Sequence, residues 1–111
     1  MERLPIRFEE EVLSKHKVSW FDECREDCYV RVDEDINDTF PFEVTKHELA
    51  GIALEAMEAG LDESKYLNLQ TISCVNLGTF YLEYGSFADM IRTSDKDFCE
   101  CIFKAVREIW G

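Results

Sequence analysis

Two stretches of the chain repeat apolar residues at the three- and four-residue spacing of an amphipathic helix. The first covers residues 45–59, where Thr45 and Glu48 have the spacing of a capping box and Gly60 follows as a stop signal. Its predicted buried face consists of Leu49, Ile52, Ala53, Ala56 and Met57. This pattern predicts a helix with one face packed on a core.

The second helical stretch covers residues 95–110. Ser94 is a favourable N-cap, and Asp95 and Asp97 place negative charge near the helix start, where the helix dipole favours it. The apolar stripe is wide and consists of Phe98, Cys99, Ile102, Phe103, Val106, Ile109 and Trp110. We expect this helix to dock the C-terminal residues onto the core.

Alternation and strand-forming residues predict two pairs of strands. Residues 17–21 and 28–32 form the first pair, with Cys28, Val30 and Val32 pointing inward. Residues 67–75 and 79–84 form the second pair around a turn at 76–78, although a helix across part of 65–84 also fits the pattern. Short helical segments are expected at 8–16 and 86–91. Four aromatic side chains near the second pair are expected to pack into the core: Phe80, Tyr81, Tyr84 and Phe87.

The predicted fold class is α+β, with a small antiparallel sheet packed by the two main amphipathic helices at about 45–59 and 95–110. A length of 111 residues and a hydrophobic fraction of 46% suit a single domain over residues 1–111. No signal-peptide pattern opens the chain, and no apolar run approaches the roughly 20 residues that span a bilayer. We therefore expect a cytoplasmic protein.

The chain carries 24 acidic and 12 basic residues, so its formal net charge is −12. The field of this charge repels phosphate backbones and anionic lipid headgroups, which argues against nucleic-acid and membrane partners. The charge is uneven, because residues 22–43 hold nine acids and two bases, a net −7. Aromatic residues lie within or beside this acidic stretch: Trp20, Phe21, Tyr29, Phe40 and Phe42.

Signals for catalytic or metal chemistry are weak. The five cysteines are an odd number, which does not suit a disulfide framework, and most are expected to be buried thiols. Cys24 and Cys28 have a spacing that zinc sites use, but Cys99 and Cys101 are two apart in a predicted helix, so only one of them should point inward. No motif pairs a cysteine with either histidine, and no glycine-rich phosphate loop occurs. We predict no catalytic, cofactor-binding or metal-binding residue, with a zinc- or thiol-dependent small protein as an alternative.

The functional prediction depends on the acidic stretch. Dense like charges repel one another in the free protein, and a cationic partner would relieve that repulsion. Aromatic residues ringed by charge are typical of binding hot spots. We predict a non-enzymatic acidic inhibitor, a cytosolic immunity protein (antitoxin) that binds a basic nuclease-type toxin domain one-to-one. The predicted partner-binding residues are Trp20, Asp22, Glu23, Glu26, Asp27, Asp33, Glu34, Asp35, Asp38 and Phe40.

Two other functions fit the same charge pattern. A phage-type anti-defence inhibitor that mimics nucleic acid would use the same electrostatics against a different target. An acidic adaptor or regulatory subunit of a larger assembly would also carry such a surface. This chain is similar to nuclease immunity proteins in its small size and acidic charge, and the prediction of that function rests on these two properties.

Overall fold

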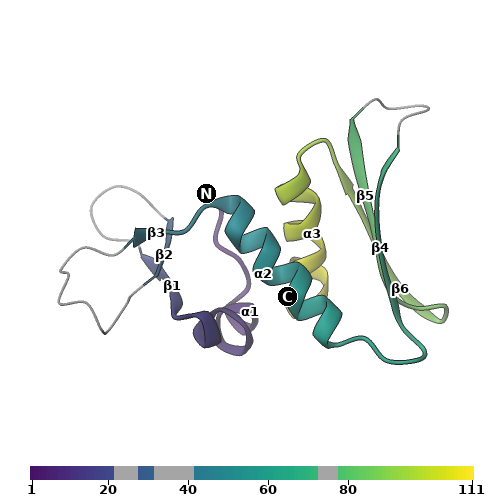
Figure 1. Cartoon of the computed structure of the whole chain (residues 1–111), viewed down its shortest axis with the longest axis horizontal. Helices are drawn as coiled ribbons and strands as arrows, with labels where there is room; N and C mark the ends of the chain where they lie inside the picture. The colour runs from purple at the N-terminus through teal and green to yellow at the C-terminus, as the bar shows by residue number, and fades with distance from the viewer. Residues whose placement is uncertain (22–27, 32–41, 73–77) are drawn as a thin grey trace.

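The computed structural model describes residues 1–21, 28–31, 42–72 and 78–111. A short helical region leads into three short strands, which are followed by a long helix, three longer strands and a final helix (Figure 1). The elements are α1 (Ile6–Glu11), the 3₁₀ helix η1 (Leu13–His16), β1 (Val18–Phe21), β2 (Cys28–Arg31), β3 (Phe42–Glu43), α2 (Lys46–Ala59), β4 (Tyr66–Ile72), β5 (Thr79–Ser86), β6 (Asp89–Asp95) and α3 (Phe98–Trp110). Over the described ranges, no helix is long and apolar enough to cross a bilayer.

The strands of the described residues form two antiparallel sheets, where the sequence pattern predicts one. β1, β2 and β3 form the first sheet, in which Trp20 lies opposite Tyr29. β4, β5 and β6 form the second sheet, in which Leu82 lies between Leu69 and Thr93. The α+β class and both predicted strand pairs are confirmed. Residues 73–77, which contain most of the predicted turn of the second pair, lie outside the described residues.

α3 lies between α2 and the β4–β6 sheet, so two of its faces are buried (Figure 1). The expectation that only one of Cys99 and Cys101 points inward is wrong, because their exposed fractions are 2% and 0%. Cys101 Sγ lies 3.6 Å from the Phe80 carbonyl oxygen of the sheet. Cys99 is instead buried in the cluster that α3 shares with α2. A helix covered on two sides needs the wide apolar stripe that the sequence shows.

Both long helices begin with a side-chain cap. Thr45 caps α2 and Gly60 follows its last residue, as the sequence predicts. α3 begins later than expected, because its N-cap is Asp97 rather than Ser94, and Asp97 Oδ1 accepts a hydrogen bond from the Glu100 amide at 3.0 Å. Ser94 and Asp95 remain in β6 because they pair with Tyr81 and Phe80 of β5. Strand pairing therefore decides which of two good capping residues starts the helix.

Residues 86–91 belong to a hairpin, and the helical turn predicted there is wrong. Ser86 pairs with Asp89, which leaves Phe87 and Ala88 as a two-residue turn. Gly85 has a φ of +127°, and a Cβ at this position would clash with the Asp89 carbonyl. Phe87 at the tip is 94% exposed, so its predicted place in the core is also wrong. The other three aromatic side chains of that prediction, Phe80, Tyr81 and Tyr84, belong to β5 and are half-buried.

The buried residues of β2 differ from the predicted alternation. Tyr29 and Val30 are both buried, with exposed fractions of 0% and 4%, although successive strand residues point to opposite faces. Cys28, which the pattern places inward, is half-buried. The prediction assumed one solvated face, whereas β2 is covered on both. Val32, the third residue predicted to point inward, lies outside the described residues.

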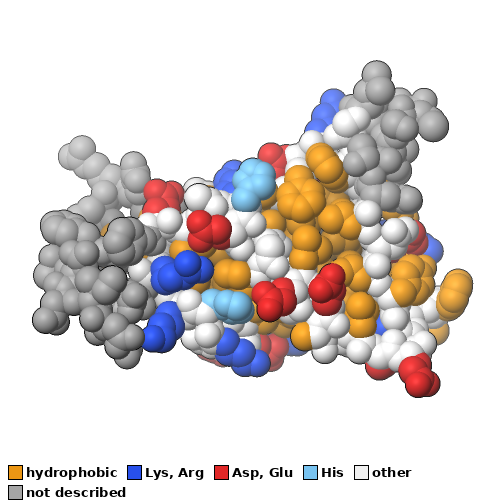
Figure 2. Space-filling view, in the orientation of Figure 1, with side chains coloured by type: hydrophobic (Ala, Val, Ile, Leu, Met, Phe, Trp, Pro, Cys, Tyr) orange, Lys and Arg blue, Asp and Glu red, His pale blue; other side chains and the backbone are white. Residues whose placement is uncertain are grey.

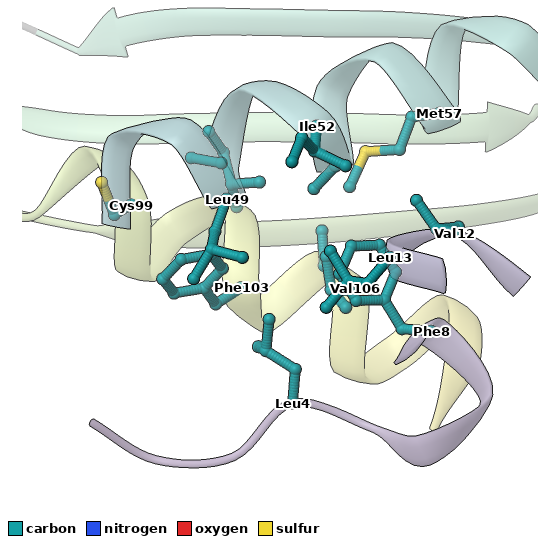
Figure 3. Close-up of a cluster of buried hydrophobic side chains, with 14 of the residues drawn as sticks. Leu4, Phe8, Val12, Leu13, Leu49, Ile52, Met57, Cys99, Phe103 and Val106 are labelled. Atoms are coloured by element: carbon teal, nitrogen blue, oxygen red, sulfur yellow. The ribbon is translucent and has the colours of Figure 1, made fainter. Parts of the chain in front are cut away.

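A cluster of buried side chains joins the N-terminal region to both long helices (Figure 3). Leu4, Phe8 and Leu13 come from the N-terminal region, where α1 and η1 replace the single helix predicted over 8–16. They belong to the same cluster as Leu49 of α2 and Phe103 of α3, and each of the five is at most 2% exposed. The N-terminal segment is thus part of the core, and this packing places α1 beside the β1–β3 sheet.

Candidate functional site

Trp20 is the one predicted partner-binding residue that falls within the described ranges. The others lie outside them: Asp22, Glu23, Glu26, Asp27, Asp33, Glu34, Asp35, Asp38 and Phe40. The structure does show where these residues join the fold, because segment 22–27 connects β1 to β2 and segment 32–41 connects β2 to β3. β2 has four residues, so at about 3.3 Å per residue the two segments join opposite ends of a strand roughly 10 Å long.

The charge excess is attached to the β1–β3 sheet. The described residues hold 16 acidic and 11 basic side chains, a net −5. The remaining eight acids and one base carry −7, and all of them lie in segments 22–27 and 32–41. More than half of the net charge of −12 is therefore connected to one small sheet. Trp20 belongs to the first strand of that sheet.

A surface groove of about 530 Å³ lies beside Trp20, where α1 and η1 meet β1. Its lining carries both signs of charge, including Arg3, Lys17 and Glu10. The Arg3 guanidinium carbon lies 5.7 Å from the centroid of the half-buried Trp20 ring, and the ring packs edge-on against Tyr29 at 4.9 Å. These two contacts hold the indole in place while part of it faces solvent.

A hydrogen-bonded network lies behind this groove. The Tyr29 hydroxyl donates to Glu9 Oε2 at 2.6 Å and accepts from the backbone N–H of Leu4 at 2.9 Å. Arg3 donates to both Glu9 oxygens, at 2.8 and 3.0 Å. The network links β2 to α1 and to the N-terminal segment, and it also holds Arg3 near Trp20. Sequence reasoning missed this network, because its partners lie 20 and 25 residues from Tyr29 and no local pattern marks them.

The two titratable groups of the network have shifted pKa values. Burial raises the pKa of Glu9, but the hydrogen bonds from Arg3 and Tyr29 and the Arg3 charge outweigh burial, so the pKa lies below its ordinary 4.5. Burial and the hydrogen bond to Glu9 raise the pKa of Tyr29 well above its ordinary 10.0. At neutral pH Glu9 is therefore a carboxylate, and Tyr29 is a neutral phenol that donates to it.

Replacing Tyr29 by phenylalanine should lower the free energy of unfolding by about 1–3 kcal/mol at pH 7, because the buried Leu4 amide loses its partner and Glu9 loses a donor. The Glu9 part of this loss should be pH-dependent. A carboxylate with a depressed pKa stabilises the fold fully above its unfolded pKa, and the contribution disappears as pH falls through the folded pKa. Urea unfolding at pH 7 and at a pH well below 4.5 should therefore show a smaller difference at the lower pH.

Tyr66→Phe is the matched control for this prediction. Its hydroxyl is half-buried and donates to Met90 Sδ, a weak acceptor, at 3.2 Å. Its removal should change the free energy of unfolding by less than about 0.5 kcal/mol at either pH. If Tyr29→Phe had the same effect at both pH values, the stabilising contribution of the hydroxyl through Glu9 would be excluded.

The cysteines and histidines of the described residues do not assemble into a site. No group of three His, Cys, Asp or Glu side chains is arranged to hold a metal ion within the described ranges, and Cys24 lies outside them. Burial raises the pKa of both Cys99 and Cys101, which keeps them as protonated thiols and poor nucleophiles. His47 is exposed on α2 with its ring 6.4 Å from that of Phe98. The Trp20 groove is therefore the candidate site among the described residues, and the acidic segments are joined to the same sheet.

No family model, curated protein or solved structure matches this chain.

Proposed function

We propose that this chain is a non-enzymatic inhibitor that occupies the cationic cleft of a basic protein, acting in the cytoplasm as the immunity protein (antitoxin) of a nuclease-type toxin. One observation carries the proposal. The segments that join the two ends of β2 hold −7 of the net charge of −12, next to an aromatic residue on the same sheet. The binding face consists of Trp20, segment 22–27 and segment 32–41.

The charges would act first on association. A nuclease cleft is basic because it binds a phosphate backbone, so it attracts a dense acidic surface over distances of about a Debye length. This attraction raises the association rate and makes that rate sensitive to salt. Once bound, the acidic segments would occupy the positions of the phosphates and exclude the substrate.

Trp20 would act mainly on dissociation. Tryptophan is enriched among the side chains that dominate binding energy, and charged residues around it help to exclude water. The indole is already packed against Tyr29 and Arg3 in the free protein, at 4.9 and 5.7 Å. A side chain ordered before binding loses little entropy on association. The Trp20 ring is thus suited to be the apolar anchor of an otherwise charged interface.

Affinity purification from the native cell with a tagged chain tests the proposal directly. The expected result is one basic partner that contains a nuclease-type domain and whose activity the purified chain blocks. A basic host-defence protein in its place would support a nucleic-acid mimic that uses the same face. A partner with no basic surface would contradict both kinds of inhibitor and favour an acidic adaptor.

Neutralising three acids of segment 32–41 should slow association with that partner. The variant Asp33→Asn, Glu34→Gln, Asp35→Asn should lower the association rate constant by roughly tenfold at low salt, since steering contributes factors of about 10–1,000. It should also reduce the slope of the rate constant against salt concentration. Stopped-flow or surface-plasmon measurements at several salt concentrations give both quantities.

A second triple variant controls for net charge. Glu55→Gln, Glu58→Gln and Glu63→Gln remove the same number of charges from exposed positions on α2 and the loop after it. This variant should keep most of the association rate, because these positions are outside the proposed face. Equal slowing by both variants would show that net charge, rather than segment 32–41, controls association.

A further inference from the structure

The β4–β6 sheet has two edges, and β4 forms the less protected one. α3 packs against β6 and β5, and the strand order β4–β5–β6 places β4 at the edge away from that contact. Alternate N–H and C=O groups of an edge strand point away from its neighbour. Among the described residues, no backbone hydrogen bond joins Tyr66–Ile72 to any strand except β5. A row of backbone donors and acceptors is therefore available along β4.

Charge distinguishes this edge from the other one. β6 carries Asp89, Arg92 and Asp95, and charged residues of this kind protect sheet edges from pairing with other chains. β4 contains no charged residue, and neither does the whole stretch of residues 66–82. This is the longest uncharged stretch in a chain of which 32% is charged. Interface centres are depleted in charged residues in the same way.

Apolar side chains lie beside this edge. Leu67 and Leu69 of β4 pack against the core but remain half-buried, because α3 does not extend over this strand. Phe80 and Phe98 are half-buried next to them, with ring centroids 5.5 Å apart. Figure 2 shows hydrophobic side chains gathered where α3 faces the sheet. The backbone edge is thus continuous with an apolar surface.

We propose that β4 is the interface between two copies of this chain, which pair their β4 strands antiparallel about a two-fold axis and form one six-stranded sheet. A two-fold interface uses the same surface on both subunits, so each free N–H of one β4 meets a free C=O of the other. A register centred on Leu69 would place β4 opposite itself with no charged residue facing another. The apolar surfaces of the two copies would then extend the interface on either side of the axis.

The lack of charge along β4 lets a second copy approach this edge despite the net charge of the chain. Two chains with a net charge of −12 repel each other except where their surfaces are uncharged. The β1–β3 sheet, which bears the acidic segments, lies at the opposite end of the molecule from the β4–β6 sheet (Figure 1). The longest dimension is 48 Å, several times the screening length of about 8 Å at physiological salt. The two β1–β3 sheets of a dimer would therefore lie far from the interface and from each other.

A basic partner has no electrostatic reason to bind this edge. The inhibitory face and the dimer interface would lie at opposite ends of each subunit, so both can be occupied together. The proposal therefore goes beyond the proposed function and does not depend on it. It changes the expected stoichiometry, because a dimer that binds one basic partner per subunit forms a two-to-two complex.

Light scattering coupled to size-exclusion chromatography tests the proposal on the full chain. The wild-type protein should have twice the monomer mass of 13.0 kDa at tens of micromolar. Asn68→Lys places a charge on the β4 edge and should weaken dimerisation by roughly tenfold or more, since like charges brought together at an interface are costly. Asn68 lies opposite Glu83 in the monomer, so the introduced lysine is compatible with the sheet. Ser94→Lys, at an exposed position on β6, adds the same charge to the other edge and should leave the dimer intact.

Hydrogen exchange provides a second test that needs no substitution. Amides of Tyr66–Ile72 that point away from β5 should exchange more slowly as protein concentration rises, whereas amides of β6 should not change. A wild-type chain that stays monomeric up to hundreds of micromolar would overturn the proposal. A dimer that Asn68→Lys and Ser94→Lys affect equally, or with no concentration-dependent protection in β4, would overturn it as well.

Discussion

Replacing Phe103 by alanine is expected to lower the free energy of unfolding by about 3–5 kcal/mol. Phe103 lies on α3 with 0% of its surface exposed, in the same buried cluster as Leu49 of α2 and Leu4 of the N-terminal segment (Figure 3). Truncation removes the burial of an aromatic ring and leaves a cavity. The cavity collapses poorly because three separate elements hold its walls. The free energy of unfolding of a small domain is about 5–15 kcal/mol in total, so the variant would retain little stability.

Phe87→Ala provides the matched control for the core prediction. It is the same chemical change, but Phe87 lies at the tip of the β5–β6 hairpin and is 94% exposed. Its free energy of unfolding should change by no more than about 0.5 kcal/mol. Urea unfolding monitored by circular dichroism measures both variants. Similar decreases in the free energy of unfolding for Phe103→Ala and Phe87→Ala would contradict the layer order in which α3 lies between α2 and the second sheet.

Replacing Trp20 by alanine is expected to weaken binding to the basic partner by about 2–4 kcal/mol, which is roughly 30-fold to 1,000-fold in Kd. The indole is an aromatic side chain on the groove of the sheet to which the acidic segments are joined. Its removal would also take away the ring that the Arg3 guanidinium lies over, although Arg3 would keep its hydrogen bonds to Glu9. Calorimetric titration with the partner measures the loss of affinity. Surface-plasmon measurements should show that this loss is a faster dissociation rate, with little change in the salt dependence of binding, since the charges stay in place.

Trp110→Ala separates binding from stability. Trp110 is also half-buried, and its ring lies 5.0 Å from that of Phe8, but it lines a different groove together with His16 and Ala59. The variant should lose stability through that packing and still bind the partner with nearly wild-type affinity. Equal losses of affinity for Trp20→Ala and Trp110→Ala, or unchanged affinity for Trp20→Ala, would rule out Trp20 as the anchor.

The two long helices were predictable because their signals are local. Helical spacing identified the face of α2, where Leu49, Ile52, Ala53 and Met57 are buried. The start of α3 was not predictable in the same way, because both Ser94 and Asp97 are good capping residues. Pairing of β6 with β5 keeps the chain extended through Asp95, and the second cap is used. A long-range contact thus chose between two local alternatives.

The candidate site was predictable only in part. Trp20 was identified from its position beside the acidic stretch, and the structure places it on a groove. Arg3, Glu9 and Tyr29 were not identified, since their network depends on α1 packing against β2. The sequence pattern also placed Tyr29 on an outward face. The alternation indicates one buried face, whereas the contacts with Leu4 and Glu9 bury Tyr29 on the other face as well.

Some features of this protein follow from composition and from neighbours a few residues apart. These are the α+β class, the apolar faces of the two long helices, the net charge of −12 and its concentration between residues 22 and 43. Others exist only once distant segments meet. Examples are the division of the strands into two sheets, the burial of α3 on two sides and the hydrogen bond from Tyr29 to Glu9. The spacing of polar and apolar residues shows which side chains favour water and which favour a buried position. Tertiary packing alone decides which element covers each apolar side chain.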